Sequence, residues 1–123
     1  MAYQRLLVVE DDPDGQAVVA HILSYMNIPI DVAGDAETAE FYLFQKHIDY
    51  GLAIIDLALP GKDGFALLND IISHPETSEL PCVAVTAYHT SKLREQAIAA
   101  GFRAYFSKPI DATSFGREVT SLL

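Results

Sequence analysis

Short apolar runs alternate with helical patterns along the whole chain. Residues 6–9, 52–55 and 82–85 are entirely apolar, 104–106 is a shorter run, and 30–33 is more polar, as an edge strand would be. Parallel strands covered on both faces typically have such continuous apolar runs. Strict alternation of strands and helices predicts a parallel sheet with helices on both faces. The sequence therefore predicts an α/β domain of five strands and five helices.

Helix start and stop signals separate the apolar runs. Asp12 followed by Pro13 is typical of an N-cap and the first helical position. Apolar residues then recur at helical spacing until Asn27 and Pro29 end the helix. Gly101 is typical of the residue that follows a helix. These signals predict a first helix that starts at Asp12 and further helices over 35–46, 65–73, 91–100 and 111–122.

Composition limits the classes of protein to which this chain can belong. Its 123 residues suffice for one domain, and 50% of them are hydrophobic, which is enough for a core without disulfides. A net charge of -9 repels phosphate backbones and anionic lipids. We therefore expect no direct binding to nucleic acid or to a membrane. The acidity fits a basic partner, a bound cation or simply a solvated surface.

The chain carries one cysteine and no pattern for export or membrane insertion. Cys82 lies in an apolar run, where a buried hydrophobic residue is more common than a catalytic thiol. The N-terminus lacks a signal-peptide pattern, and no apolar stretch approaches the roughly 18 residues that cross a bilayer. These features predict a soluble cytoplasmic protein. Met1 favours a true N-terminus, whereas the end at Leu123 leaves open whether the chain is a fragment of a hybrid kinase or larger regulator.

Polar side chains follow four of the five predicted strands. They are Glu10, Asp11 and Asp12 after the first, Asp56 after the third, Thr86 after the fourth and Lys108 after the fifth. In open α/β sheets, ligands bind outside the carboxyl ends of the strands, so we expect these side chains to meet. Carboxylates brought together repel one another, and Mg²⁺ relieves that repulsion through oxygen ligands.

The same set of groups suits phosphoryl transfer. A metal ion, an ammonium group such as Lys108 and a hydroxyl such as Thr86 stabilise the oxygens of a transferring phosphoryl group. A carboxylate such as Asp56 can act as the nucleophile and form an acyl phosphate. We therefore expect a Mg²⁺-dependent phosphoryl-transfer site at this edge of the sheet.

With these residues identified, the sequence resembles the response regulator receiver domain, the CheY-like family of two-component signalling. Four motifs carry the resemblance in the family's order and spacing: Val8-Val9-Glu10-Asp11, residues 55–64 (IDLALPGKDG), Val85-Thr86-Ala87 and residues 105–109 (YFSKP). The resemblance covers essentially the whole chain. It implies a flavodoxin-like (βα)5 fold with strand order 2-1-3-4-5, and a single receiver domain over residues 1–123 with no output domain in this chain.

The resemblance also implies a role for each motif residue. Asp56 is similar to the phosphoacceptor, Lys108 to the lysine that pairs with the phosphoryl group, and Thr86 and Tyr105 to the switch hydroxyl and switch aromatic. The implied Mg²⁺ ligands are Glu10, Asp11, Asp56 and the backbone carbonyl of Ala58. The Lys108–Pro109 bond is implied to be cis. Asp12 is predicted to be a helix cap rather than a ligand, and plain core packing is the alternative for Tyr105.

The resemblance implies partners as well. Phosphoryl donors would be a sensor histidine kinase or a histidine phosphotransfer protein, and an unknown downstream effector would bind the surface formed by the fourth helix, the fifth strand and the fifth helix. The chain would be a monomer or a weak homodimer. It would catalyse only its own phosphorylation and dephosphorylation. Ala58 and Tyr88 differ from many relatives, and we expect them to set the lifetime of the acyl phosphate.

Other functions remain open at this point. A Mg²⁺-dependent phosphatase with an aspartyl-phosphate intermediate usually has a second acid/base aspartate two residues beyond the nucleophile, where this chain has Ala58. A phosphorylation-independent scaffold of the same fold would have no use for the full set of motif residues. A flavin-binding domain would need a loop rich in Gly, Ser and Thr after the first strand, and that loop is acidic here.

Overall fold

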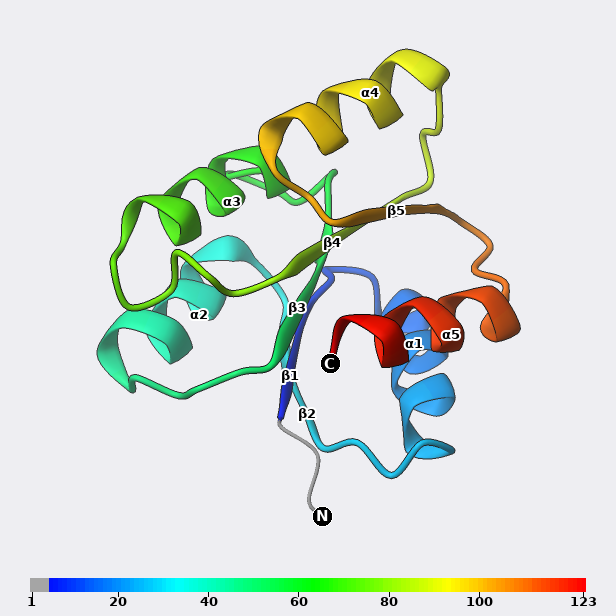
Figure 1. Ribbon diagram of the computed structural model, residues 1–123, viewed down its shortest axis with the longest axis horizontal. Coiled ribbons are helices and arrows are strands. Elements are labelled where there is room, and N and C mark those ends of the chain that lie inside the picture. Colours follow the sequence, from blue (N-terminus) through cyan, green and yellow to red (C-terminus); the bar gives the residue numbers. More distant parts are fainter. Residues whose placement is uncertain (1–4) are drawn as a thin grey trace.

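A computed structural model describes residues 5–123 and confirms the predicted five-stranded parallel sheet (Figure 1). The strands are β1 (Leu6–Val9), β2 (Ile30–Ala33), β3 (Leu52–Asp56), β4 (Cys82–Thr86) and β5 (Ala104–Ser107). They lie in the order β2-β1-β3-β4-β5, and every pairing is parallel. The more polar strand lies at an edge, as expected. The first four residues of the predicted 1–123 domain lie outside the described residues.

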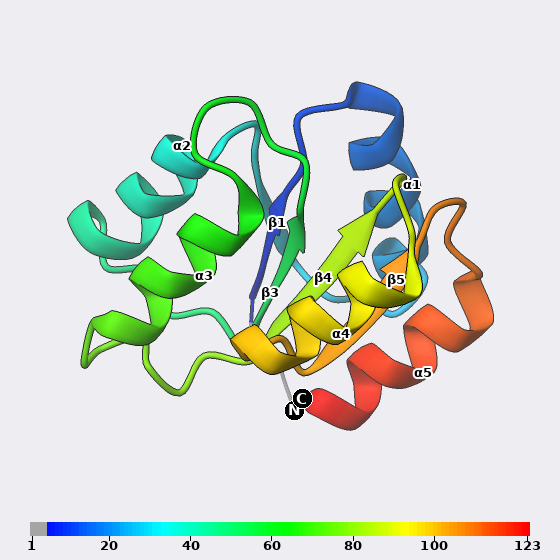
Figure 2. The same cartoon turned by 90° about the horizontal axis from the view of Figure 1, so that it is seen from above.

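Helices cover both faces of the sheet (Figure 2). Helices α1 (Pro13–Ser24) and α5 (Ala112–Leu122) lie on one face, and α2 (Ala36–Glu40), α3 (Gly64–Ser73) and α4 (Ser91–Ala100) lie on the other. Successive strand residues point to opposite faces, so Leu6 and Val8 belong to one apolar core and Leu7 and Val9 to the other. Both faces of the central strands are thus buried, which is why these runs are entirely apolar.

The helix predicted over 35–46 differs from the expectation in its last turn. After α2, residues Phe41–Gln45 form a π-helical turn, η1, which the backbone closes with a hydrogen bond from the Lys46 amide to the Phe41 carbonyl at 2.9 Å. The wider turn rotates the following side chains relative to an α-helix. Phe44 stacks on His74 at the end of α3, the neighbouring helix on the same face of the sheet, with ring centroids 4.0 Å apart, whereas Phe41 stays exposed. Aromatic packing against α3 therefore accompanies the change in helix type.

Helix caps agree with the sequence signals. Asp12 accepts hydrogen bonds from the amides of Asp14 and Gly15, which confirms it as the cap of α1. Asp63 and Asp111 cap α3 and α5 in the same way. Each cap satisfies amides that the first helical turn leaves unpaired.

Among the described residues, no helix is long and apolar enough to cross a membrane.

Two glycines of the loop after β3 have different tasks. Gly61 adopts a φ of 71°, a left-handed conformation that allows the turn. Gly64 does not have a positive φ; instead, a Cβ there would lie 2.6 Å from the backbone oxygen of Asp56. Glycine is therefore required at position 64 because α3 starts directly against the end of β3.

Arg5, Asp31 and Tyr50 form a polar clip at the β2 edge of the sheet, and this clip makes the free energy of unfolding depend on pH. Asp31 of β2 accepts a hydrogen bond from the Tyr50 hydroxyl at 2.7 Å and pairs with Arg5 at 2.8 Å. The hydrogen bond from Arg5, and then that from Tyr50, hold the pKa of Asp31 below its ordinary value.

We therefore predict a pH-dependent difference between the wild type and Asp31→Asn. A carboxyl whose pKa is lowered on folding stabilises the fold above its unfolded pKa of about 3.9, and this contribution disappears as the pH falls through the folded pKa. Urea titrations should show a less stable variant at pH 7 and a smaller difference below about pH 4. A difference that is constant with pH would contradict the role of the clip.

Candidate functional site

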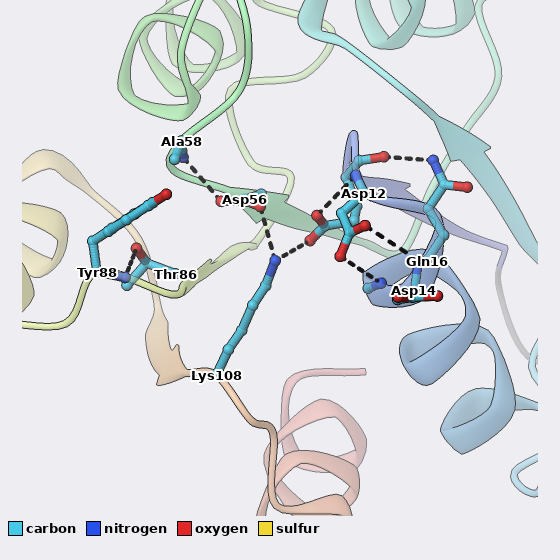
Figure 3. A network of polar contacts seen from close by, with 10 residues as sticks. Asp12, Asp14, Gln16, Asp56, Ala58, Thr86, Tyr88 and Lys108 are labelled. Atoms are coloured by element: carbon cyan, nitrogen blue, oxygen red, sulfur yellow. Dashed lines mark hydrogen bonds and ion pairs between the residues drawn. The ribbon is translucent and has the colours of Figure 1, made fainter.

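The carboxyl ends of β1, β3 and β5 bring Glu10, Asp56 and Lys108 into direct contact (Figure 3). The Lys108 ammonium donates to Glu10 Oε2 at 2.7 Å and to Asp56 Oδ2 at 3.0 Å. Both carboxylates are almost fully buried, with 3% of Glu10 and 5% of Asp56 exposed. Buried charges are stable only when they are paired. Lys108 therefore bridges two carboxylates from different strands and neutralises one of their two charges.

Asp11 completes an acidic cluster at this point. One carboxylate oxygen each from Glu10, Asp11 and Asp56 lies within 4.8 Å of the others, and Asp11 is exposed while the other two are buried. Asp12 is occupied as the cap of α1 and is not a member of the cluster. Oxygen ligands of this kind suit Mg²⁺, which typically uses one or two carboxylates together with water and phosphate oxygens, so three carboxylates are sufficient. The donor set therefore fits the predicted ion.

A cavity of about 280 Å³ opens over the cluster. Its lining consists of Lys108, the three carboxylates of the cluster and Asp12. Three neutral residues from the loops after β3 and β4 complete the lining: Ala58, Ala87 and Tyr88. Tyr88 is 72% exposed, so its ring stands at the rim of the cavity rather than in the core. The cavity gives a small anionic group access to Asp56.

Backbone contacts fix the two buried carboxylates in place. The Ala58 amide donates to Asp56 Oδ1 at 2.9 Å, and the Asp12 amide donates to Glu10 Oε1 at 3.2 Å. Gln16 donates from its side chain to the Glu10 carbonyl at 2.6 Å. All four carboxylate oxygens of Glu10 and Asp56 thus have partners. These hydrogen bonds hold both carboxylates in defined orientations.

Gly15 and Gln16 are functional neighbours that the sequence did not single out. A Cβ at Gly15 would lie 2.8 Å from Glu10 Cδ, so a larger residue there would displace the Glu10 side chain from the position it has under the first turn of α1. The signal in the sequence was a glycine in the first turn of a helix, a position where glycine has no propensity advantage. The reason for it becomes visible only in three dimensions.

Electrostatics of the site follow from burial and pairing. Burial raises the pKa of Glu10 above its ordinary value, and the hydrogen bond from Lys108 opposes this only in part. Burial alone would lower the pKa of Lys108, but its bonds to Glu10 and Asp56 outweigh that effect and raise it. Lys108 is therefore firmly protonated. A divalent cation that approached Glu10 and Asp56 would compete with this ammonium for the same oxygens.

The predicted switch residues lie beside the site. Thr86 ends β4, is 1% exposed, and its hydroxyl oxygen accepts a hydrogen bond from the Tyr88 amide at 3.0 Å. Tyr105 of β5 is partly buried, and its hydroxyl shares a hydrogen bond with exposed His89 Nδ1 at 3.0 Å. The Tyr105 hydroxyl is therefore tied to the loop that follows Thr86, while the Tyr105 side chain packs against the core. The Lys108–Pro109 bond is cis, as the resemblance implied.

Cys82 takes no part in this site. It lies in β4 with 1% exposure, and burial raises the pKa of its thiol to about 12. A thiol that stays protonated is a poor nucleophile. The expectation of a buried structural cysteine is confirmed.

Comparisons with known proteins agree with the geometry. The family model described as the response regulator receiver domain matches residues 6–119. An uncharacterized 14.6 kDa protein from the sodA1 3′ region of Leptolyngbya boryana is 33% identical over 111 residues, which cover 90% of this chain and 83% of that protein. Two further curated relatives are the transcriptional regulatory protein PmrA of Pectobacterium parmentieri, which is 32% identical, and the phosphate regulon transcriptional regulatory protein PhoB of Rhizobium meliloti, which is 28% identical. The matches cover 97% of this chain but 52% of each relative, so the chain spans about half of their length.

Solved structures show the same fold. A putative response regulator from Chloroflexus aurantiacus has a TM-score of 0.89 and 26% identity, with 98% of this chain and 97% of that chain covered. The receiver domain of the sensor histidine kinase PA1611 from Pseudomonas aeruginosa has a TM-score of 0.87 and 26% identity, with 98% of both chains covered. In that crystal structure, a magnesium ion is coordinated in the active site cleft.

Proposed function

This chain belongs to the response regulator receiver domain family, and from that premise we propose that it accepts a phosphoryl group on Asp56. The donor would be a sensor histidine kinase or a histidine phosphotransfer protein. The observation that carries the proposal is the Asp56 carboxylate itself. It is buried at the floor of an open cavity and accepts a hydrogen bond from Lys108. One of its oxygens lies within 4.8 Å of oxygens of two further carboxylates.

The residues of the chain supply most of the proposed mechanism. An Asp56 oxygen attacks the phosphorus of the donor, the phosphorus–nitrogen bond breaks, and the leaving imidazole keeps the electron pair. Lys108 stays protonated and neutralises negative charge on the transferring group. The Ala58 amide keeps the Asp56 carboxylate oriented through its bond to Oδ1. Glu10, Asp11, Asp56 and the Ala58 carbonyl would hold Mg²⁺, which when bound supplies positive charge for the phosphoryl oxygens.

The response would be a shift between two conformations. Phosphorylation would draw the Thr86 hydroxyl away from the Tyr88 amide and toward the phosphoryl group, and Tyr105 would leave His89 and turn inward. The surface formed by α4, β5 and α5 would then change its affinity for a downstream effector. Such a change is a population shift biased by new charge at Asp56. In this role the chain catalyses only its own phosphorylation and dephosphorylation, and it acts as one receiver domain in the cytoplasm.

The direct test is phosphorylation by a small donor. We expect the protein to gain one phosphoryl group when incubated with acetyl phosphate and Mg²⁺, measured by intact mass, and none when EDTA removes the ion. Beryllofluoride with Mg²⁺ should shift the NMR signals of Thr86 and Tyr105. If no donor gives an adduct and beryllofluoride leaves both signals unchanged, the proposal fails and a phosphorylation-independent scaffold takes its place.

We predict that Ala58 and Tyr88 prolong the life of the acyl phosphate. Both line the cavity over Asp56, Ala58 has no polar side-chain atom, and the Tyr88 ring stands at the rim. Replacing them together by Ala58→Asn and Tyr88→Ser should admit and orient a hydrolytic water. We expect loss of phosphate to become about tenfold faster, which equals about 1.4 kcal/mol in the barrier.

The measurement is the decay of the phosphorylated form after the donor is removed. Ser78→Asn, a variant on the exposed segment before β4, is the matched control and should decay like the wild type. Equal decay rates for the double variant and the wild type would contradict the role of the two residues.

A further inference from the structure

Lys62 forms an ionic triad outside the site that has been described. It lies in the loop between β3 and α3, and its ammonium donates to both oxygens of Glu40 in α2 at 3.2 and 3.0 Å. It also donates to Asp70 Oδ2 in α3. The three side chains are 34%, 21% and 30% exposed, so the triad is mostly shielded from solvent. One lysine thus connects the loop to two helices.

The charges of the triad depend on this lysine. Burial and the neighbouring Asp70 raise the pKa of Glu40, while Glu40 and Lys62 lower that of Asp70. Hydrogen bonds to Asp70 and Glu40 raise the pKa of Lys62 above its ordinary value. Within residues 5–123, Lys62 is the sole cation in salt-bridge contact with either carboxylate. Without it, two adjacent carboxylates would repel each other across the α2–α3 interface.

The loop that Lys62 holds is the one that faces Asp56. Its inner part is anchored by the buried side chains of Leu57 and Leu59, and the Gly64 amide closes it on the Leu57 carbonyl at 3.1 Å. Its outer part, Pro60 and Gly61, reaches solvent with Gly61 in a left-handed conformation. In the described contacts, Lys62 provides the side-chain tether of this outer part to α2.

We propose that Lys62 is a positioning residue for the site: together with Glu40 and Asp70 it holds the loop so that the Ala58 backbone lies against Asp56. The inference rests on the proposed function, because it assigns Lys62 an effect on divalent-cation binding and on phosphoryl transfer. Lys62 and Ala58 belong to the same loop, and the Ala58 amide of this loop donates directly to Asp56 Oδ1. A loop released from α2 would sample other conformations and present the Ala58 amide and carbonyl less often in the required place.

The sign of the effect separates positioning from simple electrostatics. Removing a positive charge makes the local potential more negative, which by itself would strengthen Mg²⁺ binding. Loss of positioning would weaken it. We expect Lys62→Met to weaken Mg²⁺ binding, measured by isothermal titration calorimetry, by about tenfold, the lower end of the range for residues that support metal ligands. Phosphorylation by acetyl phosphate at subsaturating Mg²⁺ should slow to a similar extent.

Two variants complete the experiment. Lys62→Arg keeps the charge and can reach both carboxylates, so it should restore wild-type Mg²⁺ affinity. Lys92→Met removes an exposed lysine of α4 that makes no ion pair in the described structure, and should leave the affinity unchanged. Unfolding in urea should confirm that all variants are folded at the assay temperature.

The possible outcomes distinguish the two proposals. Unchanged or tighter Mg²⁺ binding by Lys62→Met, or failure of Lys62→Arg to restore affinity, would overturn the role of Lys62. No adduct on the wild type and no response to beryllofluoride, with Mg²⁺ binding intact, would overturn the proposed function, while the calorimetric comparison would still decide the role of Lys62. If the wild type binds no Mg²⁺, both proposals are wrong.

Discussion

Asp56→Asn is expected to abolish the phosphoryl adduct that acetyl phosphate and Mg²⁺ place on the wild type. Asparagine matches the shape of aspartate, and its side-chain oxygen can still accept the hydrogen bond from the Ala58 amide. It cannot form an acyl phosphate, because a neutral amide is not the nucleophile that a carboxylate is. Intact mass measurement after incubation should therefore show a full adduct on the wild type and none on the variant.

The variant should remain folded, so that the loss can be assigned to chemistry. Lys108 keeps its bond to Glu10 at 2.7 Å when Asp56 becomes neutral, and no buried charge is left unpaired. We expect the free energy of unfolding to change by about 1–2 kcal/mol at most, the range of ordinary substitutions. Urea titration of the variant without Mg²⁺ would check this.

Asp12→Asn is the matched control for the loss of one carboxylate at the same edge of the sheet. Asp12 caps α1 and is not a member of the acidic cluster, and asparagine is an equally good cap. At saturating Mg²⁺ this variant should take up the phosphoryl group as the wild type does. An adduct on Asp56→Asn, or its loss in Asp12→Asn alone, would place the phosphoacceptor elsewhere.

Lys108→Met is expected to have three effects: a lower free energy of unfolding, tighter Mg²⁺ binding and slower phosphorylation. Without Lys108, the buried carboxylates of Glu10 and Asp56 face each other with no counter-charge. Removing one partner of a buried ion pair typically destabilises a protein by about 3–5 kcal/mol. We expect about 3 kcal/mol at pH 7 with EDTA present, because the remaining carboxylates can take up a proton.

Mg²⁺ should restore much of this stability and should bind more tightly than to the wild type. In the wild type the ammonium occupies Glu10 Oε2 and Asp56 Oδ2, two oxygens that the ion would use or approach. Its removal frees them. Phosphorylation should nevertheless become about 10²-fold slower, since a charged donor to the transferring oxygens is lost.

Urea unfolding with EDTA and with Mg²⁺, calorimetry, and adduct formation over time measure these three effects. Lys92→Met on exposed α4 carries the same charge change and should alter the unfolding free energy by no more than about 0.5 kcal/mol. An equal loss of stability in Lys108→Met with and without Mg²⁺ would show that the ion and the lysine do not share the same carboxylates.

The strands and the approximate helix limits followed from the sequence because their signals are local. Continuous apolar runs mark strands that are buried on both faces, and a cap such as Asp12 marks a helix start within its own turn. The last turn of the 35–46 helix was not predictable. Its π-helical form accompanies the stacking of Phe44 on His74, a residue from the end of the neighbouring helix α3.

The members of the site were also readable in advance, since parallel strands end at one edge of the sheet and each motif follows a strand end. This places Glu10, Asp56, Thr86 and Lys108 near one another whatever the details of packing. The need for glycine at position 64 does not follow from the sequence, because its close approach to Asp56 depends on where α3 starts relative to β3. The same holds for Gly15, whose neighbour is the Glu10 side chain.

The sequence by itself thus determined the order of elements, the sheet and the set of residues at its edge, all of which depend on periodicity and on short motifs. The tertiary structure alone decided which side chains pair. Lys108 contacts Glu10 across 98 positions of the chain, and Lys62 of the loop after β3 contacts Glu40 at the end of α2. Such partners are selected by the packing of distant segments and by the need to pair each buried charge, and neither is encoded in local spacing.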